Sequence, residues 1–438
     1  MAQTTRRNPG RPVYVVDGTR TPFLKARGKP GPFKAVDLAV AAGRPLLLRQ
    51  PFEADRFDEV ILGCVAPGPD EANIGRIAAL RLGCGERVPA WTVQRNCASG
   101  MQALDAAFRN IADGRSDLVL AGGVESMSHS PVLLSDGMVA WLAEWQRARS
   151  PLARFRQLTR LRPRDLAPVI GLLRGLRDPV VGISMGQTAE NLAHRFGLSR
   201  EQMDAFAMRS HQRLAAAYEA GHLADEIAIA YARDGTHYER DDGLRADTDM
   251  AQLARLRPVF DKPFGTVTAG NSAQVTDGCA WLVLASEKAV KEHDLAVLGR
   301  IVDVEWAGLD PAQMGLGPVH ATVPLLKRKR LSLDKIDYWE INEAFAAQVL
   351  ACVEALKDER YCKESLGLGK AAGEIPIEHL NVDGGGISLG HPVGASGARI
   401  VLHLLHVLRR ENARRGIASL CIGGGQGGAM LVENTATE

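Results

Sequence analysis

The sequence lacks the features that mark several large classes of protein. Lysines and arginines number 53 against 51 aspartates and glutamates, and the net charge of +2 gives no global reason to expect a nucleic-acid or membrane partner. No segment approaches the ~18 to 20 consecutive apolar residues of a membrane span. The seven cysteines are an odd set without CxxC spacing, which supports neither a disulfide framework nor a zinc site.

Both ends of the chain lack recognisable targeting signals. Residues 1–12 are polar, carry three arginines and contain no apolar core segment, unlike a secretory signal. The final Ala-Thr-Glu is not a peroxisomal address. We therefore expect a protein of the reducing cytoplasm.

Length and composition indicate an α/β protein of more than one lobe. A chain of 438 residues exceeds one ordinary core, and 46% hydrophobic residues with 45 glycines suit a loop-rich α/β architecture. In the first part of the chain, the pattern predicts alternating elements: strands at 12–16, 57–65 and 117–120, and helices at 35–48, 73–82 and 98–107. The same alternation restarts at residue 269.

An internal sequence repeat indicates that the two lobes are alike. The segments PLLLR (45–49) and FDEVI (57–61) correspond, at constant offset, to PLLKR (324–328) and IDYWE (336–340). The tripeptide Ala-Ser-Gly opens a helix in each half, and each helix leads to a strand and a glycine cluster. Two matching βα lobes fit this pattern better than one continuous sheet.

We therefore divide the chain into two lobes and a cap. The N-terminal lobe comprises residues 1–127 and 266–298, and the C-terminal lobe comprises 299–438. Residues 128–265 lie between them. Their pattern is helical and irregular, with clear helices at 188–196 and 200–220, which is typical of an inserted cap domain.

Residues 141–177, within the cap, are rich in arginine. Nine arginines face few acidic residues, and Leu152, Phe155, Leu158 and Leu161 recur among them at helical spacing. A basic amphipathic helix can lie on an anionic membrane surface or bind an acidic partner. Packing of the apolar stripe on the rest of the domain is an equally good interpretation, because any surface helix shows such a stripe.

Cys97 lies where an apolar strand pattern gives way to a helical one, in VQRNCASGMQAL (93–104). The unpaired amides and partial positive charge of a helix N-terminus favour the thiolate, which is the nucleophilic form of cysteine. The other interpretation is a buried structural cysteine, because free cysteine is among the most buried residue types.

Two glycine-rich segments near the end of the chain carry further candidates. GGGISLGHPVGASGA (384–398) places His391 in a loop with little side-chain bulk, where an imidazole can act as a base near neutral pH. LCIGGGQGGAM (420–430) places Cys421 at the end of a buried-looking strand, followed by backbone amides suited to an oxyanion. Tight packing is the alternative, and a phosphate loop is disfavoured because the lysine of a P-loop is missing.

A fourth segment, INEAFAA (341–347), carries Asn342, which in isolation indicates only a helix cap. Together, however, the four segments resemble the thiolase family: NCASG, NEAF, GHPxGASGAR and CxGGGxG occur in the family's order and approximate spacing. The resemblance covers nearly the whole chain and extends to GTRTPF, GGVESM, MGQTAE, LRPVF and GTVTAGNS. It implies a thiolase-like fold of two similar βα lobes in a layered α-β-α-β-α arrangement, with an inserted and mostly helical cap.

The resemblance also implies a role for each candidate. Cys97 would be the nucleophile that takes the acyl group as a thioester, activated by His391 and the helix terminus. Cys421 would move a proton to or from the acetyl-CoA carbon, and Asn342 would hold a water that, with His391, stabilises the enolate oxygen. The amides of Cys97 and Gly423 would stabilise the oxyanion of acyl transfer. No metal ion is implied.

Coenzyme A is implied as a substrate rather than as a permanently bound cofactor. By resemblance, the cap would cradle it, with Arg245 near its nucleotide end and four residues beside its pantetheine arm: Met185, Ala269, Ala273 and Met314. Two positions depart from the family pattern. Ser184 replaces a histidine common in short-chain members, and Ala273 replaces a serine or threonine, so the resemblance leaves chain-length preference open.

The long segment at 141–177 looks like the insertion in the thiolase subunits of fatty-acid β-oxidation complexes, which favours a 3-ketoacyl-CoA thiolase (acetyl-CoA C-acyltransferase). Its partners would be acyl-CoA and CoA, further copies in a homodimer or larger oligomer, and a hydratase/dehydrogenase subunit, with no nucleic acid. An acetoacetyl-CoA thiolase (acetyl-CoA C-acetyltransferase) is the alternative enzyme. A non-catalytic lipid-binding or scaffold relative is the alternative of a different class. A ketoacyl synthase is disfavoured, because by resemblance it would use two histidines and lack Cys421.

Overall fold

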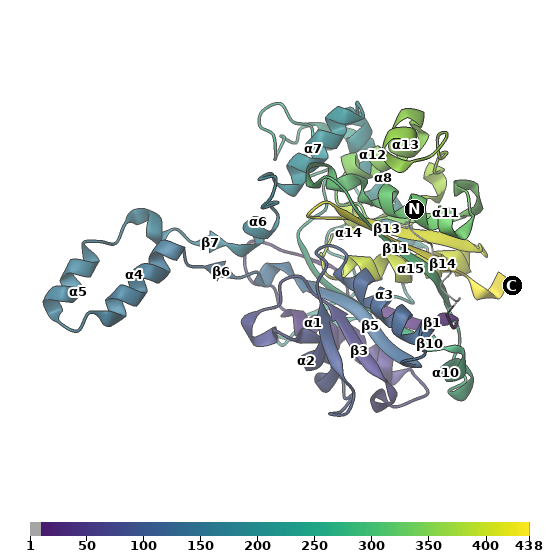
Figure 1. The fold of residues 1–438 in the computed structure, drawn as a ribbon, viewed down its shortest axis with the longest axis horizontal. Helices are drawn as coiled ribbons and strands as arrows, with labels where there is room; N and C mark the ends of the chain where they lie inside the picture. Colours follow the sequence, from purple (N-terminus) through teal and green to yellow (C-terminus); the bar gives the residue numbers. More distant parts are fainter. Residues whose placement is uncertain (1–9, 438) are drawn as a thin grey trace, which may run out of the picture.

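The structure is a computed structural model that describes residues 10–437 (Figure 1). The expectations about the polar start of the chain and its last residue therefore lie largely outside the described part. Within this part, no helix is both long enough and apolar enough to cross a membrane.

One hydrogen-bonded sheet of ten strands forms the centre of the molecule. Its order is β12-β13-β14-β11-β1-β10-β5-β3-β4, and β2 pairs with β10 beside this path. The strands are β1 (Val13–Arg20), β2 (Leu24–Lys25), β3 (Glu59–Gly63), β4 (Ala90–Val93), β5 (Leu118–Ser126), β10 (Thr276–Ser286), β11 (Gly299–Gly308), β12 (Tyr338–Ile341), β13 (Arg415–Ile422) and β14 (Gln426–Glu433).

The two halves of the sheet repeat one another, as the sequence predicts. The order β1-β10-β5-β3 in the first half matches β11-β14-β13-β12 in the second, with antiparallel pairs followed by one parallel pair in each. The halves are not separate sheets, however, because β1 pairs with β11 between Val13–Val15 and residues 299–301. This short antiparallel pairing removes two free strand edges from the middle of the molecule.

Helices form layers outside and between the two halves of the sheet. Between the halves lie α3 (Ser99–Ala112) and α15 (Ser396–Arg410), and their apolar side chains share one core with both halves. The outer layers are formed by α1 (Ala35–Leu48) and α2 (Ile74–Arg81) on the first half and by α11 (Gly317–Lys329) and α12 (Ala346–Lys357) on the second. The predicted layered α-β-α-β-α fold is confirmed.

Glycines allow the two central helices and β5 to approach one another. A Cβ added to Gly100 would lie 2.8 Å from the carbonyl oxygen of Gly394, and one added to Gly397 would lie 2.6 Å from the amide nitrogen of Met101. Gly123 lies within β5, where a Cβ would come within 2.0 Å of the same Gly394 oxygen. The glycine cluster after residue 120 therefore serves close packing and not a turn, which extends the predicted strand to Ser126.

The cap consists mainly of helices. Its helical part packs against α12 of the second half, and its hairpin packs beside α1 of the first half. Its principal helices, α7 (Met185–Arg195) and α8 (Arg200–Glu219), agree closely with the predicted ones. Apart from the arm at residues 132–177, the remaining α-helix and strands of the cap are α9 (Met250–Ala254) and the hairpin of β8 (Ala230–Tyr231) and β9 (His237–Tyr238). Outside the cap, the short helices are α10 (Glu287–Glu292), α13 (Glu359–Leu366) and α14 (Gly386–Leu389).

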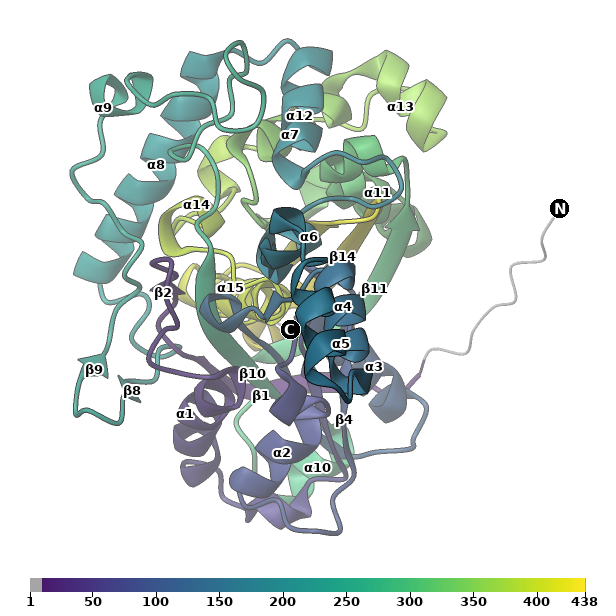
Figure 2. The ribbon, with the colours of Figure 1, turned by 90° about the vertical axis from the view of Figure 1, so that its left-hand side faces the viewer.

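Residues 132–177 form an arm whose outer part stands away from the rest of the molecule in Figure 1 and points toward the viewer in Figure 2. Its base is a two-stranded ribbon, and its tip consists of two helices. The elements are β6 (Val132–Leu133), α4 (Asp136–Arg147), α5 (Pro151–Leu158), β7 (Val169–Ile170) and α6 (Gly171–Gly175). Leu152, Phe155 and Leu158 are 61%, 64% and 52% exposed, so the apolar stripe of α5 is not packed on the rest of the domain.

Candidate active site

Cys97 lies in the short connection between β4 and α3. Asn96, directly before it, has a left-handed φ of 43°, a conformation that asparagine tolerates better than most residues. The hydroxyl of Ser99 donates to the carbonyl of Asn96 at 2.8 Å and accepts from the amide of Arg95 at 2.9 Å. These bonds fix the turn that presents Cys97 at the start of the helix.

The connection between β13 and β14 meets this turn. The side-chain amide of Asn96 donates to the carbonyl of Gly423 at 2.8 Å. The amide of Gly423 in turn donates to the Cys97 sulfur. Met185, at the start of α7, lies beside the same glycine, because a Cβ added there would be 3.2 Å from its sulfur.

The other predicted catalytic residues lie on neighbouring segments. Cys421 is the last residue but one of β13 and is 1% exposed, and its thiol is close enough to Cys97 for the two to interact electrostatically. The amide of Asn342 donates to the carbonyl of Ser419, two residues before Cys421, at 2.9 Å. The side-chain nitrogen of Asn342 lies 3.5 Å from both ring nitrogens of His391. Segments more than 300 positions apart in the sequence are thus gathered at one place.

Burial determines the ionisation of both thiols. It raises the pKa of the Cys97 thiol above its ordinary value, although hydrogen bonds from the amides of Gly423 and of Cys97 itself act in the opposite direction. Burial also raises the pKa of Cys421, and the neighbouring Cys97 adds to this effect. The amides at the helix start therefore favour the thiolate, as the sequence predicts, but burial outweighs them, and Cys97 needs a base to take its proton.

His391 has the ionisation state that such a base requires. Burial, with a smaller contribution from the Arg399 guanidinium, lowers the pKa of its imidazole to about 4. The ring is neutral at pH 7 and keeps one nitrogen lone pair for a proton. The arrangement can therefore take a proton from one thiol, exchange a proton through a second, and hold an oxyanion on backbone amides.

Comparison with known proteins is consistent with this chemistry. Two family profiles cover most of the chain: "Thiolase, N-terminal domain" matches residues 13–288 and "Thiolase, C-terminal domain" matches residues 295–434. The chain belongs to the thiolase family. It is an acyltransferase, as the members of this family are.

Named thiolases resemble the chain over almost its whole length. A beta-ketoadipyl-CoA thiolase of Pseudomonas aeruginosa is 41% identical, over 97% of this chain and 99% of the relative. A 3-ketoacyl-CoA thiolase of Yersinia pestis is 36% identical, over 96% of each. Among solved structures, human mitochondrial 3-ketoacyl-CoA thiolase in complex with CoA has a TM-score of 0.83 at 37% identity, over 97% of this chain and 98% of that one. The acetyl-CoA acetyltransferase of Bacillus anthracis has a TM-score of 0.84 at 37% identity, over 98% and 100%.

A buried carboxylate holds the Asn342 segment of this thiolase against its histidine loop. Glu343 accepts hydrogen bonds from Ser210 at 2.6 Å, from Asn381 at 2.9 Å and from the amide of Ile387 at 3.2 Å. A Cβ on Gly385 would lie 2.5 Å from the same carboxyl carbon. The glycine cluster before His391 therefore gives room to Glu343, a purpose that the sequence pattern did not reveal.

Of the residues predicted to contact coenzyme A, two lie next to the candidate active-site segments. Met185 adjoins Gly423, and the amide of Ala273 donates to the carbonyl of Ala344, two residues after Asn342, at 2.9 Å. Arg245, on the cap, and Ala269, four residues after the end of the cap, are exposed. Met314 is 2% exposed and belongs to the core.

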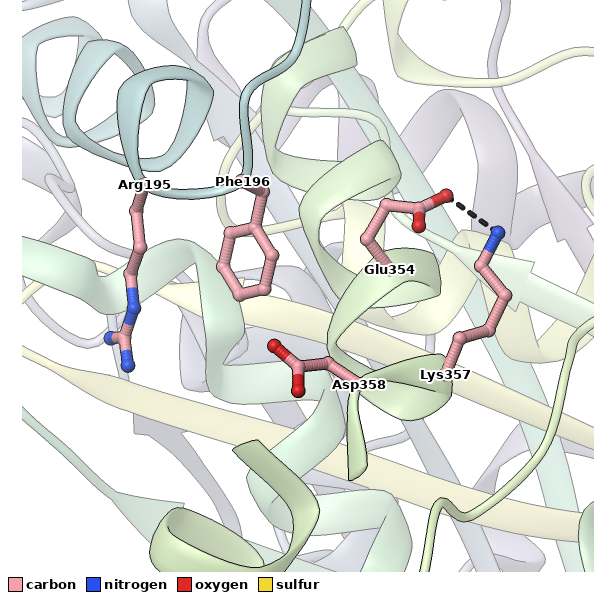
Figure 3. A pocket seen from close by; sticks show the side chains of 5 residues that line it. All are labelled: Arg195, Phe196, Glu354, Lys357 and Asp358. Carbon is pink, nitrogen blue, oxygen red and sulfur yellow. Dashed lines mark ion pairs between the residues drawn. The ribbon is translucent and has the colours of Figure 1, made fainter. Parts of the chain in front are cut away.

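An open pocket of about 330 Å³ lies elsewhere on the thiolase, at the C-terminal ends of α7 and α12 (Figure 3). Its lining is mostly charged, and its Lys357 and Glu354 pair with each other at 2.6 Å. None of the candidate catalytic or coenzyme-binding residues lines it. We therefore do not assign this pocket to the active site.

Proposed function

We propose that the protein is a 3-ketoacyl-CoA thiolase of fatty-acid β-oxidation, which cleaves 3-ketoacyl-CoA with CoA into acetyl-CoA and a shortened acyl-CoA. The observation that carries this proposal is the convergence of the half-buried Cys97, the buried Cys421, the amide of Gly423 and the Asn342 side chain that adjoins His391. Together they supply what reversible carbon–carbon cleavage by acyl transfer requires.

The first half-reaction begins at Cys97. His391 accepts the thiol proton while the sulfur attacks the 3-keto carbon, and the amides of Cys97 and Gly423 stabilise the resulting oxyanion. Breaking the C2–C3 bond leaves an acyl group on Cys97 and an enolate of acetyl-CoA. Cys421 gives its proton to the enolate carbon. Asn342 and His391 stabilise the enolate oxygen through a bound water, a role supported by the buried and unpaired side-chain oxygen of Asn342.

The second half-reaction releases the shortened chain. A new CoA thiol loses its proton to the Cys421 thiolate and attacks the thioester on Cys97, and the proton held by His391 returns to the departing Cys97 sulfur. Coenzyme A is thus a substrate, and the scheme uses no permanently bound cofactor or metal ion. Arg245, Met185, Ala269, Ala273 and Met314 are proposed to contact it.

Trapping of the acyl-enzyme tests this assignment. With labelled acetyl-CoA, we expect a thioester that is absent from Cys97→Ser, and turnover at least about 10³-fold lower in that variant. Cys421→Ala should keep much of the acyl-enzyme formation but stop carbon–carbon chemistry, whereas His391→Ala should impair both. Equal loss of both half-reactions in Cys421→Ala would refute its separate role. No thioester in the unmodified chain would favour a scaffold.

A substrate panel separates the enzymatic alternatives. The similar proteins carry names with different substrates, among them a beta-ketoadipyl-CoA thiolase and an acetyl-CoA acetyltransferase. We expect higher kcat/KM on 3-ketoacyl-CoA of ten or more carbons than on acetoacetyl-CoA. The reverse order would identify an acetoacetyl-CoA thiolase, and a preference for a chain with a terminal carboxylate would indicate a substrate like that of the Pseudomonas relative.

We also propose a cytoplasmic homodimer or larger oligomer. The seven cysteines are all unpaired, as expected of a reducing compartment.

For the arm, we propose docking on an anionic lipid surface. Within residues 10–437, most of the exposed large apolar side chains lie between 132 and 181. Nine arginines are interspersed with them, and this combination suits the boundary between lipid headgroups and acyl chains. A hydratase/dehydrogenase subunit is the other occupant that the test must distinguish.

A further inference from the structure

Ser396, the first residue of α15, lies against the candidate base. It is 1% exposed, and its hydroxyl oxygen is 2.6 Å from Nδ1 of His391, five residues earlier. The same oxygen is 3.1 Å from the carbonyl oxygen of Pro392, one turn back along the chain. The side chain bonds to no helix amide, so the ordinary structural use of serine at a helix start does not explain it.

The chemistry of the groups limits the direction of these two bonds. A serine hydroxyl has one proton, and the carbonyl of Pro392 can only accept. The same carbonyl also accepts from the amides of Ala395 and Ser396, at 2.9 and 3.0 Å. When the hydroxyl donates to Pro392, its lone pair accepts from the imidazole. Nδ1 of His391 then carries the ring proton, and Nε2 keeps the lone pair. The opposite direction, from the hydroxyl to Nδ1, would place the ring proton on Nε2, and the tautomer measurement below separates the two. The Asn342 amide, a donor 3.5 Å from both ring nitrogens, does not distinguish the two tautomers.

We propose that Ser396 is a positioning residue that holds His391 as the Nδ1–H tautomer, so that Nε2 is the atom that accepts the proton of Cys97. This inference rests on the proposed role of His391. Without the hydroxyl, the imidazole ring can rotate or change tautomer. The ring proton can then lie on Nε2, which must be unprotonated to accept the proton of Cys97. In serine proteases, an aspartate carboxylate plays the same role: it accepts a hydrogen bond from Nδ1–H of the catalytic histidine and holds its tautomer and orientation.

The internal repeat supports the positioning role of Ser396, because the other half of the chain has a serine at the equivalent position. Ser99 occupies the equivalent position at the start of α3, and its hydroxyl also bonds back to a preceding carbonyl, that of Asn96 at 2.8 Å. In the first half this bond fixes the turn that carries Cys97. In the second half, the equivalent serine fixes the histidine. The two symmetry-related serines thus orient the two reacting partners, one from each lobe.

The tautomer can be observed without any enzyme assay. In the full chain labelled with ¹⁵N-histidine, we expect long-range ¹H–¹⁵N correlations of His391 typical of Nδ1–H, assigned by their loss in His391→Gln. Ser396→Ala should move the signals toward Nε2–H, and Ser396→Thr, which keeps the hydroxyl, should restore them. Ser388→Ala is the matched control, since Ser388 is buried in α14, three residues before His391, but bonds to Gly385 and Ser210.

The kinetic arm uses single-turnover acetylation of Cys97 by acetyl-CoA. We expect Ser396→Ala to lower the rate constant of acetylation at saturating acetyl-CoA by about tenfold, the size of one lost neutral hydrogen bond, with little change in the half-saturating concentration. Ser396→Thr should recover most of the rate. An Nε2–H signal in the unmodified chain, or an unchanged tautomer in Ser396→Ala, would overturn the inference. If the tautomer changed as expected while His391→Ala acetylated at the native rate, the proposed function of His391 would fail instead.

Discussion

Cys97 and His391 show how burial acts in opposite directions on a thiol and an imidazole. Both side chains lose water, which disfavours the charged form of each: the pKa of the thiol rises, and that of the imidazole falls to about 4. At neutral pH, both the thiol and the imidazole are therefore uncharged. In the proposed mechanism, proton transfer to His391 accompanies attack on the substrate and does not precede it.

This ground state predicts an unusual pH dependence for acylation. His391 accepts a proton only while neutral, so the rate should stay nearly constant between pH 5.5 and 8 and fall toward pH 4, as the imidazole becomes protonated. Single-turnover acetylation of Cys97, followed by mass spectrometry with circular dichroism to confirm folding, measures this. A half-maximal loss near pH 6.5, the ordinary range of histidine, would contradict the lowered pKa.

Among the elements, the arm is the one whose sequence and surroundings disagree most with an ordinary surface helix. The spacing of Leu152, Phe155 and Leu158 predicts a helix, and the structure forms one. Their exposure is decided by the ribbon of β6 and β7, which carries α4 and α5 away from the lobes (Figure 1). Spacing alone cannot distinguish a stripe that packs from a stripe that stays exposed.

Vesicle co-sedimentation tests the lipid-docking proposal for the arm. The full chain should bind vesicles of phosphatidylcholine and phosphatidylglycerol, and bind pure phosphatidylcholine weakly. Binding should fall about tenfold or more at 0.5 M salt and in a variant with Leu152→Ser, Phe155→Ser and Leu158→Ser, because both charge and apolar area contribute.

Leu48→Ser is the control for that variant, since Leu48 is 81% exposed on α1, outside the arm. Absence of vesicle binding by the full chain would refute the lipid surface. If a hydratase/dehydrogenase subunit then co-purified with the full chain but not with the triple variant, the arm would be a subunit contact.

At the scale of the whole molecule, a buried charge network joins the first strand, the cap and the last helix. Arg20 of β1 pairs with Glu226 of the cap at 2.6 Å and with Asp241 at 2.7 Å. His403 of α15 pairs with the same Glu226 at 2.9 Å and with Asp383 at 3.3 Å. Although burial opposes its charge, these carboxylates raise the pKa of His403 to about 10. The imidazolium is thus a fixed part of the fold at neutral pH.

The raised pKa of His403 sets the sign of a stability prediction. A folded value above the unfolded one means that the stabilisation is complete below about pH 6.5 and is lost as the pH rises toward 10. His403→Gln should lower the free energy of unfolding by about 3 kcal/mol at pH 6.5, because it removes the imidazolium that Glu226 and Asp383 share and leaves Arg20 and Arg410 as their cationic partners. Urea denaturation at pH 6.5, 8 and 9.5 measures both effects.

The exposed His237 provides the control: His237→Gln should leave the free energy of unfolding unchanged at each pH. The unmodified chain should lose stability relative to His403→Gln between pH 6.5 and 9.5. A constant difference between these two chains over that range would show that His403 is not charged in the folded protein.

The sequence by itself determined the alternation of strands and helices, the internal repeat, and those candidate site residues that lie within the four thiolase-like motifs. Local periodicity and motif spacing carry this information, since they depend on neighbours along the chain. Cys97, His391, Cys421, Asn342 and Gly423 could all be named in this way. Their roles in catalysis stay predictions until the variants are measured.

Only the tertiary structure decided the pairing of β1 with β11, the exposure of the arm, the raised pKa of Cys97 and the bond between Ser396 and His391. Each depends on which distant segments exclude water from a group or come within hydrogen-bond distance of it. Ser396 lies within the GHPxGASGAR motif, but its contact with His391 depends on how the loop after His391 folds back onto the start of α15. Desolvation and hydrogen-bond direction are properties of the folded neighbourhood, and no local pattern encodes them.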